Sequence, residues 1–210
     1  MKEDQLQDEL TSIRALMERS SKFISLSGLS GVLAGIYALI GAVIAYKMVY
    51  THNGLFYTRD YVVASTESDP STLYNLIIVA LSVLILSIVS GIILTRRKAK
   101  KNGQPVWGKT SKSLLFYMAT PLLTGGALII IFIIRGYLGI VAPASLIFYG
   151  LALIGASNFT FGDVKYLGIF EIILGLIAAL LPGYGLLFWA IGFGILHIIY
   201  GSIMYFKYDR

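Results

Sequence analysis

The stretch YLGIFEIILGLIAALLPGYGLLFWAIGFGILHIIYGSIMYF, residues 166–206, contains the pattern that decides the fold class. Only Pro182 and Gly183 separate two apolar runs, 166–181 and 184–206, and each approaches the roughly 20 residues that an α-helix needs to cross a bilayer. Backbone groups in hydrocarbon must be hydrogen-bonded within the chain, and neither run alternates as a barrel strand does. The stretch therefore predicts a hairpin of two membrane-spanning helices.

Four further apolar runs precede this hairpin, so the chain is expected to be an all-α, polytopic membrane protein with a six-transmembrane-helix bundle. Of its 210 residues, 57% are hydrophobic and 13% charged, and the mean hydropathy is +0.78. Soluble domains carry about 25% charged residues, so this composition excludes an ordinary soluble globular domain. The expected spans, which form one domain of residues 23–206, cover residues 23–46, 73–95, 113–134, 141–161, 166–181 and 184–206.

Residues 1–22, which precede the first span, predict a short amphipathic helix. Leu6, Leu10, Ile13 and Met17 recur every three or four residues and would lie on one face of a helix. The segment 4–19 carries a net negative charge, which disfavours adsorption to anionic lipid headgroups. Besides the lipid bilayer, we therefore expect either a protein partner bound through residues 4–19 or a second copy of the chain.

The distribution of positive residues indicates how the spans are oriented. All but three of the 17 Lys and Arg residues fall in the N-terminal segment, the loops after spans two and four, and the tail 207–210; the exceptions are Lys47, Arg59 and Arg135. Because Lys and Arg concentrate on the cytoplasmic side of membranes, we expect both termini to be cytoplasmic in the cell inner (plasma) membrane. The same rule accounts for the seven cations of loop 96–112 without a nucleic-acid partner.

Two ionisable residues, Glu171 and His197, lie within the expected spans. A charge in hydrocarbon costs at least about 2.5–3.5 kcal/mol on insertion scales, so such residues are normally paired or line a pathway. In an antiparallel hairpin that turns at Pro182 and Gly183, positions 171 and 197 stand at the same level, and we predict that the two side chains face each other. Further polar residues predicted at similar depth complete the candidate cluster: Asn158, Thr120, Ser87 and Ser90.

Small residues repeat on three of the spans at the spacing of close helix packing. Gly, Ala and Ser at every third or fourth position let helix backbones approach each other, within one chain or between two copies. Because the stripes of spans five and six include Glu171 and His197, we expect these two stripes to face each other. The predicted packing seams are Ser27, Gly31 and Gly35 in the first span, Gly168 and Gly175 in the fifth, and Ala190, Gly194 and Gly201 in the sixth.

No catalytic or metal-binding constellation stands out. The sequence has no cysteine, and its two histidines, His52 and His197, cannot alone supply a four-ligand zinc site, so we expect neither a metal nor a cofactor. The segment Gly28-Leu29-Ser30-Gly31 resembles the GxSG motif of rhomboid intramembrane proteases, which also have a histidine in the sixth span. That resemblance implies a hydrolase with Ser30 and His197 as a dyad, although here the serine lies in the first span rather than in the fourth core span.

A longer resemblance concerns location rather than chemistry. Residues 17–28, MERSSKFISLSG, and residues 37–42, YALIGA, resemble uncharacterised small bacterial inner-membrane proteins of similar length. The resemblance implies a bacterial inner-membrane location and six spans, and it implies no activity.

The leading interpretation is a non-enzymatic accessory, regulatory or scaffold component of the membrane, because packing seams dominate the chain. The alternative is a small secondary transporter or channel that uses the intramembrane Glu171 and His197 pair. A rhomboid-like hydrolase is the third interpretation. The sequence leaves open the substrate, the partner, the oligomeric state and the role of the aromatic outer loop 47–72.

Overall fold

Every regular element that the structure describes is helical. The computed structural model describes residues 26–50, 70–103 and 106–209, so the amphipathic helix expected at 4–19 and most of the outer loop 47–72 lie outside the described residues. The elements are α2 (Gly28–Tyr50), α4 (Pro70–Lys101), α5 (Lys109–Ile134), the 3-10 turn η2 (Leu138–Ile140), α6 (Val141–Ser157), α7 (Val164–Leu180), α8 (Gly185–Trp189), the π-helical turn η3 (Ala190–Leu196) and α9 (His197–Tyr208).

Most of these helices have the length and composition of membrane spans. Helix α7 has 17 residues and is about 26 Å long at 1.5 Å per residue, a little shorter than a typical hydrocarbon core of about 30 Å. Large apolar side chains such as Leu123 and Leu180 are 72% and 80% exposed, which lipid tolerates and water does not. The segments long and apolar enough to cross a bilayer are Gly28–Val49, Leu73–Lys101, Lys109–Ile134, Leu138–Ser157 and Gly185–Tyr208. These features indicate a multi-pass membrane protein.

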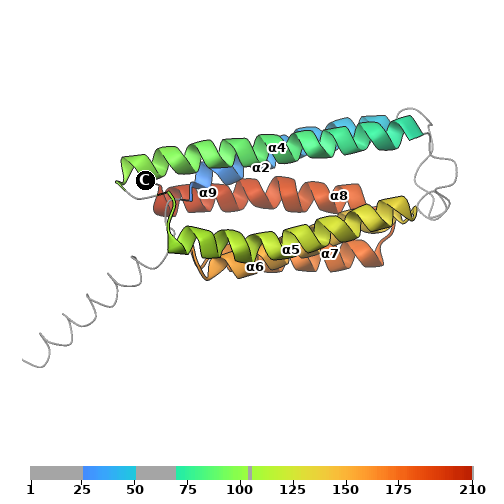
Figure 1. Cartoon of the computed structure of the whole chain (residues 1–210). Helices are drawn as coiled ribbons and strands as arrows, with labels where there is room; N and C mark the ends of the chain where they lie inside the picture. Colours follow the sequence, from blue (N-terminus) through green and yellow to red (C-terminus); the bar gives the residue numbers. More distant parts are fainter. Residues whose placement is uncertain (1–25, 51–69, 104–105, 210) are drawn as a thin grey trace, which may run out of the picture.

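The helices are arranged around the last one in the chain. Helices α8, η3 and α9 follow one another without a break, and together they are called the last helix below. In Figure 1 the last helix lies between two groups: α2 with α4 on one side, and α5, α6 and α7 on the other. The short connections between the spans expected at 141–161, 166–181 and 184–206 predict that these three form one tight group. Helices α6 and α7 do form the most extensive contact, but the last helix packs more on α2 than on α7.

Glycine contacts explain this arrangement and correct the expected pairing of the seams. A Cβ atom at Gly35 of α2 would lie 2.6 Å from the carbonyl oxygen of Gly194, so α2 packs directly on the backbone of the last helix. A Cβ at Gly168 of α7 would lie 2.6 Å from the carbonyl oxygen of Gly150, so the α7 seam packs on α6 instead of on the last helix. Similar contacts join Gly31 to Gly201 and Gly175 to Pro143. Glycine lets helix backbones approach each other closely. The α7 seam could therefore pack either on α6 or on the last helix, and it packs on α6.

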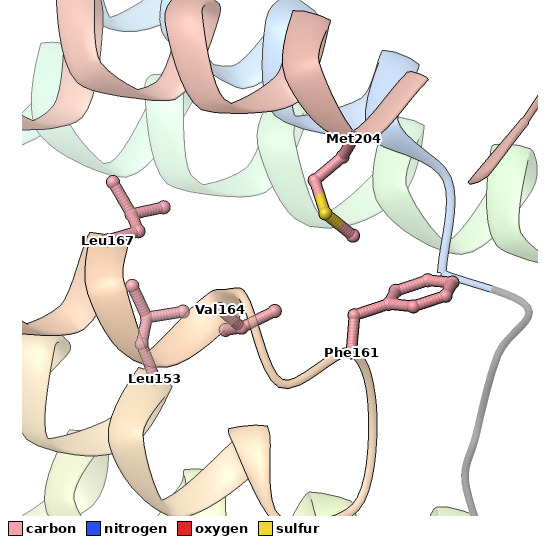
Figure 2. Close-up of a cluster of buried hydrophobic side chains, with 5 residues drawn as sticks. All are labelled: Leu153, Phe161, Val164, Leu167 and Met204. Atoms are coloured by element: carbon pink, nitrogen blue, oxygen red, sulfur yellow. The ribbon is translucent and has the colours of Figure 1, made fainter. Parts of the chain in front are cut away.

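An apolar core closes one end of the molecule, where α9 ends. Figure 2 shows Met204 of α9 pointing towards Phe161 in the turn between α6 and α7, with Leu153, Val164 and Leu167 beside them. All five side chains are buried. Burying large apolar side chains stabilises this contact by about 1.5–3 kcal/mol each relative to leaving them in water. The core therefore fixes the position of α9 along its axis relative to the α6–α7 pair, and this position sets the level of His197.

Candidate functional site

Glu171 and His197 meet inside the bundle. Glu171 lies on α7 and is 0% exposed, and His197 is the first residue of α9 and is 6% exposed. The Nδ1 atom of His197 lies 3.4 Å from Oε1 of Glu171. The antiparallel register predicted this approach, and the apolar core described above holds the two helices at the level that allows it.

Two other groups hold the His197 ring in place. Nδ1 lies 3.0 Å from the carbonyl oxygen of Gly192, and Nε2 lies 2.7 Å from the hydroxyl oxygen of Tyr149 on α6. A carbonyl oxygen only accepts, so Nδ1 carries a hydrogen and donates it to Gly192. In the neutral ring Nε2 then accepts a hydrogen bond from the Tyr149 hydroxyl. The ring is therefore oriented from both sides by groups on two different elements.

The Glu171 carboxyl group is buried without a hydrogen bond. Within the described part of the chain, neither Oε1 nor Oε2 has a hydrogen-bond partner. Gly192 makes room for the group, because a Cβ at that position would lie 2.5 Å from Oε2 of Glu171 and 2.5 Å from Cδ2 of Leu146. Burying a polar group without a compensating hydrogen bond costs free energy, and an ionised one costs far more. Glu171 is therefore energetically expensive in this arrangement.

A change of helix type in the last helix occurs next to this cluster. Residues Ala190–Leu196 form the π-helical turn η3, which includes the predicted seam residues Ala190 and Gly194 and ends immediately before His197. Gly192, the acceptor for Nδ1, lies inside this turn. π-helical turns are rare and occur frequently at functional sites, since they displace backbone groups from the regular α-helical pattern. Sequence patterns did not predict this turn.

Aromatic rings surround the histidine. Trp189, Phe193 and His197 follow each other at intervals of one helical turn, with ring centroids 5.2 Å and 5.9 Å apart. The Tyr149 ring lies 5.0 Å from the Phe193 centroid and 5.3 Å from the His197 centroid. Such rings bury a large apolar area and pack in defined orientations. Apart from the Tyr149 hydroxyl, the Gly192 carbonyl and the Glu171 carboxyl group, the His197 ring therefore has aromatic neighbours.

Three of the other polar residues predicted for the cluster, Thr120, Ser90 and Asn158, donate hydrogen bonds within their own helices. Thr120 is exposed and donates to the carbonyl oxygen of Phe116 at 2.9 Å. Ser90 donates to the carbonyl oxygen of Ser87 at 3.1 Å, on a helix whose main contact is with α2. Asn158 is exposed at the end of α6 and donates to the carbonyl oxygen of Gly155 at 3.4 Å. Matching depth along different helices was therefore a poor guide to contact.

The Ser30 and His197 dyad that the rhomboid resemblance implies is not formed in this arrangement. Ser30 donates its hydroxyl hydrogen to the carbonyl oxygen of Ser27 at 2.6 Å. The two His197 ring nitrogens are engaged with Tyr149 and Gly192. A serine nucleophile needs a hydrogen bond to its base, and here both groups bond elsewhere.

A second polar cluster, which we call the end clasp, joins three helices where α2 begins and α9 ends. Asp209 accepts hydrogen bonds from Ser27 Oγ at 3.0 Å and from the backbone nitrogen of Gly28 at 2.9 Å, so it caps the N-terminus of α2. Its other carboxylate oxygen pairs with Lys98 of α4. Lys98 also donates to the carbonyl oxygen of Leu26 at 2.8 Å. The predicted seam residue Ser27 thus belongs to the clasp rather than to a packing contact.

A smaller ionic group extends the same end of the molecule. Asp163, between α6 and α7, accepts hydrogen bonds from Lys207 Nζ at 2.6 Å and from the Tyr208 hydroxyl at 2.9 Å. The hydrogen bond from Lys207 lowers the pKa of Asp163 below its usual value, and the Tyr208 hydrogen bond adds to this effect. The Tyr208 ring stacks on Phe161 with the centroids 4.1 Å apart. The chain end is therefore tied to the α6–α7 turn by polar and apolar contacts.

Sequence reasoning missed two residues of the Glu171 cluster, Tyr149 and Gly192. Tyr149 lies at the midpoint of α6, whereas tyrosines in spanning helices usually lie near the membrane interfaces, and this unusual position was an available signal. Gly192 lies outside the three-and-four spacing of the predicted seam. Its role comes from the packing of Leu146 and Glu171 against it and from the hydrogen bond that its carbonyl oxygen accepts from His197.

Neither the metal-ligating side chains nor the comparisons with known proteins assign an activity to this cluster. Among the described residues, no group of three or more His, Cys, Asp or Glu side chains lies together in a way that could hold a metal ion. The chain matches no family model, no curated protein and no solved structure.

Proposed function

We propose that the protein is a non-enzymatic multi-pass membrane protein that moves a small ion through the cluster of Glu171, His197 and Tyr149. The observation that carries this proposal is the buried Glu171 carboxyl group, which accepts no hydrogen bond from the described residues. Between the two roles that an intramembrane Glu and His pair can play, structural link or ion site, this observation favours the ion site.

The reasoning is energetic. A structural link stabilises a bundle because its donors and acceptors satisfy each other, which contributes about 0.5–1.5 kcal/mol per hydrogen bond. Glu171 makes no such bond, because Nδ1 of His197 bonds to Gly192 instead. A buried carboxyl that costs stability and contributes no hydrogen bond is expected where the group changes its charge or its ligand during function. The π-helical turn next to Glu171 is of a kind that occurs frequently at functional sites.

The topology that we propose has six spans, with α7 as the fifth, and cytoplasmic N- and C-termini in a bacterial inner membrane. Lys165 and Tyr166 at one end of α7, and Pro182 and Gly183 after its other end, are typical span boundaries and support its membrane insertion. We also propose that residues 4–19 form an amphipathic helix that binds a protein partner or a second copy of the chain.

The first test uses single cysteines, since the native chain has none. Ala178 lies two turns along α7 from Glu171 and is 2% exposed, as is Ala38 of α2, which serves as a matched buried control. We expect Ala178→Cys in membranes to react with a small membrane-impermeant thiol reagent, because an ion site must open to water during its cycle. Ala38→Cys should react only after denaturation.

Equal protection of the two cysteines at every pH tested would contradict ion movement through this cluster. It would instead favour the second candidate, an accessory, regulatory or scaffold component. That candidate has its own support in the direct backbone contacts at Gly35 with Gly194 and at Gly150 with Gly168, which are typical of a rigid assembly.

A further inference from the structure

The chemistry of the cluster restricts the ion that it can take. The acidic residues that the structure describes are Asp163, Glu171 and Asp209, and the first and last of these bond to Lys207 and Lys98 at the end of the molecule. Glu171 is therefore the one described carboxylate at the buried cluster. Hard metal cations take about six oxygen ligands, usually with more than one carboxylate for a divalent ion. A single carboxylate beside a histidine ring is better suited to a proton.

We propose that the ion is a proton and that His197 passes it across its ring from Tyr149 to Glu171. This inference rests on the proposed function, since it names the ion that the same site moves. The geometry points to it because Nδ1 of His197 has two acceptors within reach, the Gly192 carbonyl at 3.0 Å and Glu171 Oε1 at 3.4 Å. Nε2 on the other side of the ring is 2.7 Å from the Tyr149 hydroxyl.

The transfer balances with one incoming proton from water. Tyr149 gives its hydroxyl proton to Nε2 and takes the incoming proton on its oxygen, so tyrosine is unchanged and the ring becomes an imidazolium. Nδ1 then shifts its hydrogen bond from Gly192 to Glu171, its N–H bond breaks, and Oε1 forms an O–H bond. The ring is left neutral with its proton on Nε2, and the carboxylate has become a carboxylic acid. Glu171 then loses its proton to the other side. The ring returns to its first tautomer when Nε2 gives its proton to water and Nδ1 takes one from water, both on the side of entry, so that one proton has crossed in each cycle.

The titratable groups that face His197 come from α6 and α7. Helix α6 contributes Tyr149 and α7 contributes Glu171, whereas α2 presents the backbone near Gly31 and Gly35. Tyr149 acts on Nε2, and Gly192 acts as the resting acceptor for Nδ1. The π-helical turn that holds Gly192 is thus the element whose rearrangement would release Nδ1 towards Glu171.

The experiment measures proton flux in vesicles reconstituted with the full-length protein. A pH-sensitive dye is trapped inside, a pH gradient is imposed, and potassium with an ionophore clamps the membrane potential. We expect acidification of the wild-type vesicles well above that of protein-free vesicles. Glu171→Gln and His197→Gln should lower the protein-dependent rate by about 100-fold or more, as expected when a positioned proton donor or acceptor is lost. Tyr149→Phe should lower it less, because water can replace the hydroxyl group.

Tyr200→Phe is the matched control. It removes a buried hydroxyl group from α9, the helix of His197, at a position near the apolar core rather than in the cluster. It should keep the wild-type rate. An unchanged rate in Glu171→Gln would overturn the proposed relay. Sodium or potassium flux that depends on Glu171, without proton flux, would overturn the proton while preserving ion movement. The absence of proton, sodium and potassium flux would contradict both the relay and the proposed ion movement.

A spectroscopic measurement keeps the proposal testable where a variant fails to fold. Infrared difference spectra of the wild-type protein between low and high pH should contain a carboxylic acid C=O band from a buried group. The band should be absent in Glu171→Gln and should shift in His197→Gln, because the two groups exchange the proton. A spectrum without a buried carboxylic acid band at any pH would overturn the assignment of Glu171 as the proton acceptor.

Discussion

Nδ1 of His197 lies 3.4 Å from Oε1 of Glu171, yet it hydrogen-bonds to the carbonyl oxygen of Gly192. The acid and the base are thus adjacent but not joined. In an ordinary interhelical hydrogen bond the two side chains would satisfy each other. Glu171 has no such bond, so a substitution at this position measures how much its buried carboxyl group costs the protein in stability.

Replacing Glu171 by methionine should stabilise the protein. Replacing buried ionic groups by well-packed apolar residues of similar volume is often neutral or stabilising by about 1–4 kcal/mol. The stabilising direction is expected here because the Glu171 oxygens accept no hydrogen bond from the described residues, so their removal leaves no donor unsatisfied. Thermal unfolding in detergent, followed by tryptophan fluorescence, measures the change. Asp209→Asn is the comparison, since it removes the charge of a carboxylate that is fully bonded, and it should destabilise. A lower melting temperature for Glu171→Met would mean that the carboxyl has a partner that stabilises it.

An alanine at position 192 should disturb the cluster. Its Cβ would lie 2.5 Å from Glu171 Oε2 and from Leu146, so Gly192→Ala is expected to destabilise by about 1–3 kcal/mol through overpacking. Gly126→Ala in α5 is the control, because no atom lies within 4 Å of its Cβ position and alanine favours a helix over glycine by up to about 1 kcal/mol. Combining Gly192→Ala with Glu171→Ala should recover part of the loss. Additive losses would place the clash elsewhere.

Breaking the end clasp should loosen the bundle. Asp209→Ala leaves the Ser27 hydroxyl and the first backbone donor of α2 without their acceptor, and each buried unsatisfied group costs about 1–3 kcal/mol. Lys98 loses its ion-pair partner and keeps only the Leu26 carbonyl oxygen. We expect a lower melting temperature and faster proteolysis of the chain end. Lys100→Ala, at an exposed position on α4, the helix of Lys98, should change neither the melting temperature nor the rate of proteolysis. If Asp209→Ala behaves like Lys100→Ala, the clasp does not contribute to stability.

The ion pair at Asp163 should make stability depend on acid pH. The hydrogen bond from Lys207 lowers the pKa of Asp163 below the ordinary value of 3.8, so its contribution is fully present above that value and is lost as the pH falls through the lower folded-state pKa. Asp163→Asn should flatten this part of the melting temperature profile. An equally steep profile in the variant would assign the acid sensitivity to other carboxylates.

Cysteines in two loops test the proposed orientation. Asn102 follows α4 and Tyr137 follows α5, and both are exposed. An impermeant thiol reagent should label Tyr137→Cys in intact cells and Asn102→Cys only after the membrane is opened, because the proposed topology puts the α4–α5 loop in the cytoplasm. The reverse pattern would invert every span.

Several features could be predicted from the sequence because they depend on local patterns. The length of the apolar runs determines helices of bilayer-spanning size, since hydrocarbon leaves backbone groups no partner outside their own segment. The turn at Pro182 and Gly183 determines the register of the hairpin, and that register brings Glu171 and His197 to the same level.

Which helix surfaces meet depends on the packing of the whole bundle. A glycine stripe can pack on any other glycine stripe, so the sequence could not show that Gly168 would choose Gly150 or that Gly194 would choose Gly35. The same holds for Thr120 and Asn158, whose depth suited the cluster but whose hydrogen bonds stay within their own helices.

Local sequence patterns were enough to predict apolar spanning helices and the level at which Glu171 and His197 face each other. The tertiary structure decided that Tyr149 and Gly192 take both ring nitrogens of His197 and leave Glu171 without a hydrogen bond. The physical reason is that periodicity and charge act along one segment, whereas hydrogen-bond partners depend on how segments distant in the chain share a limited space.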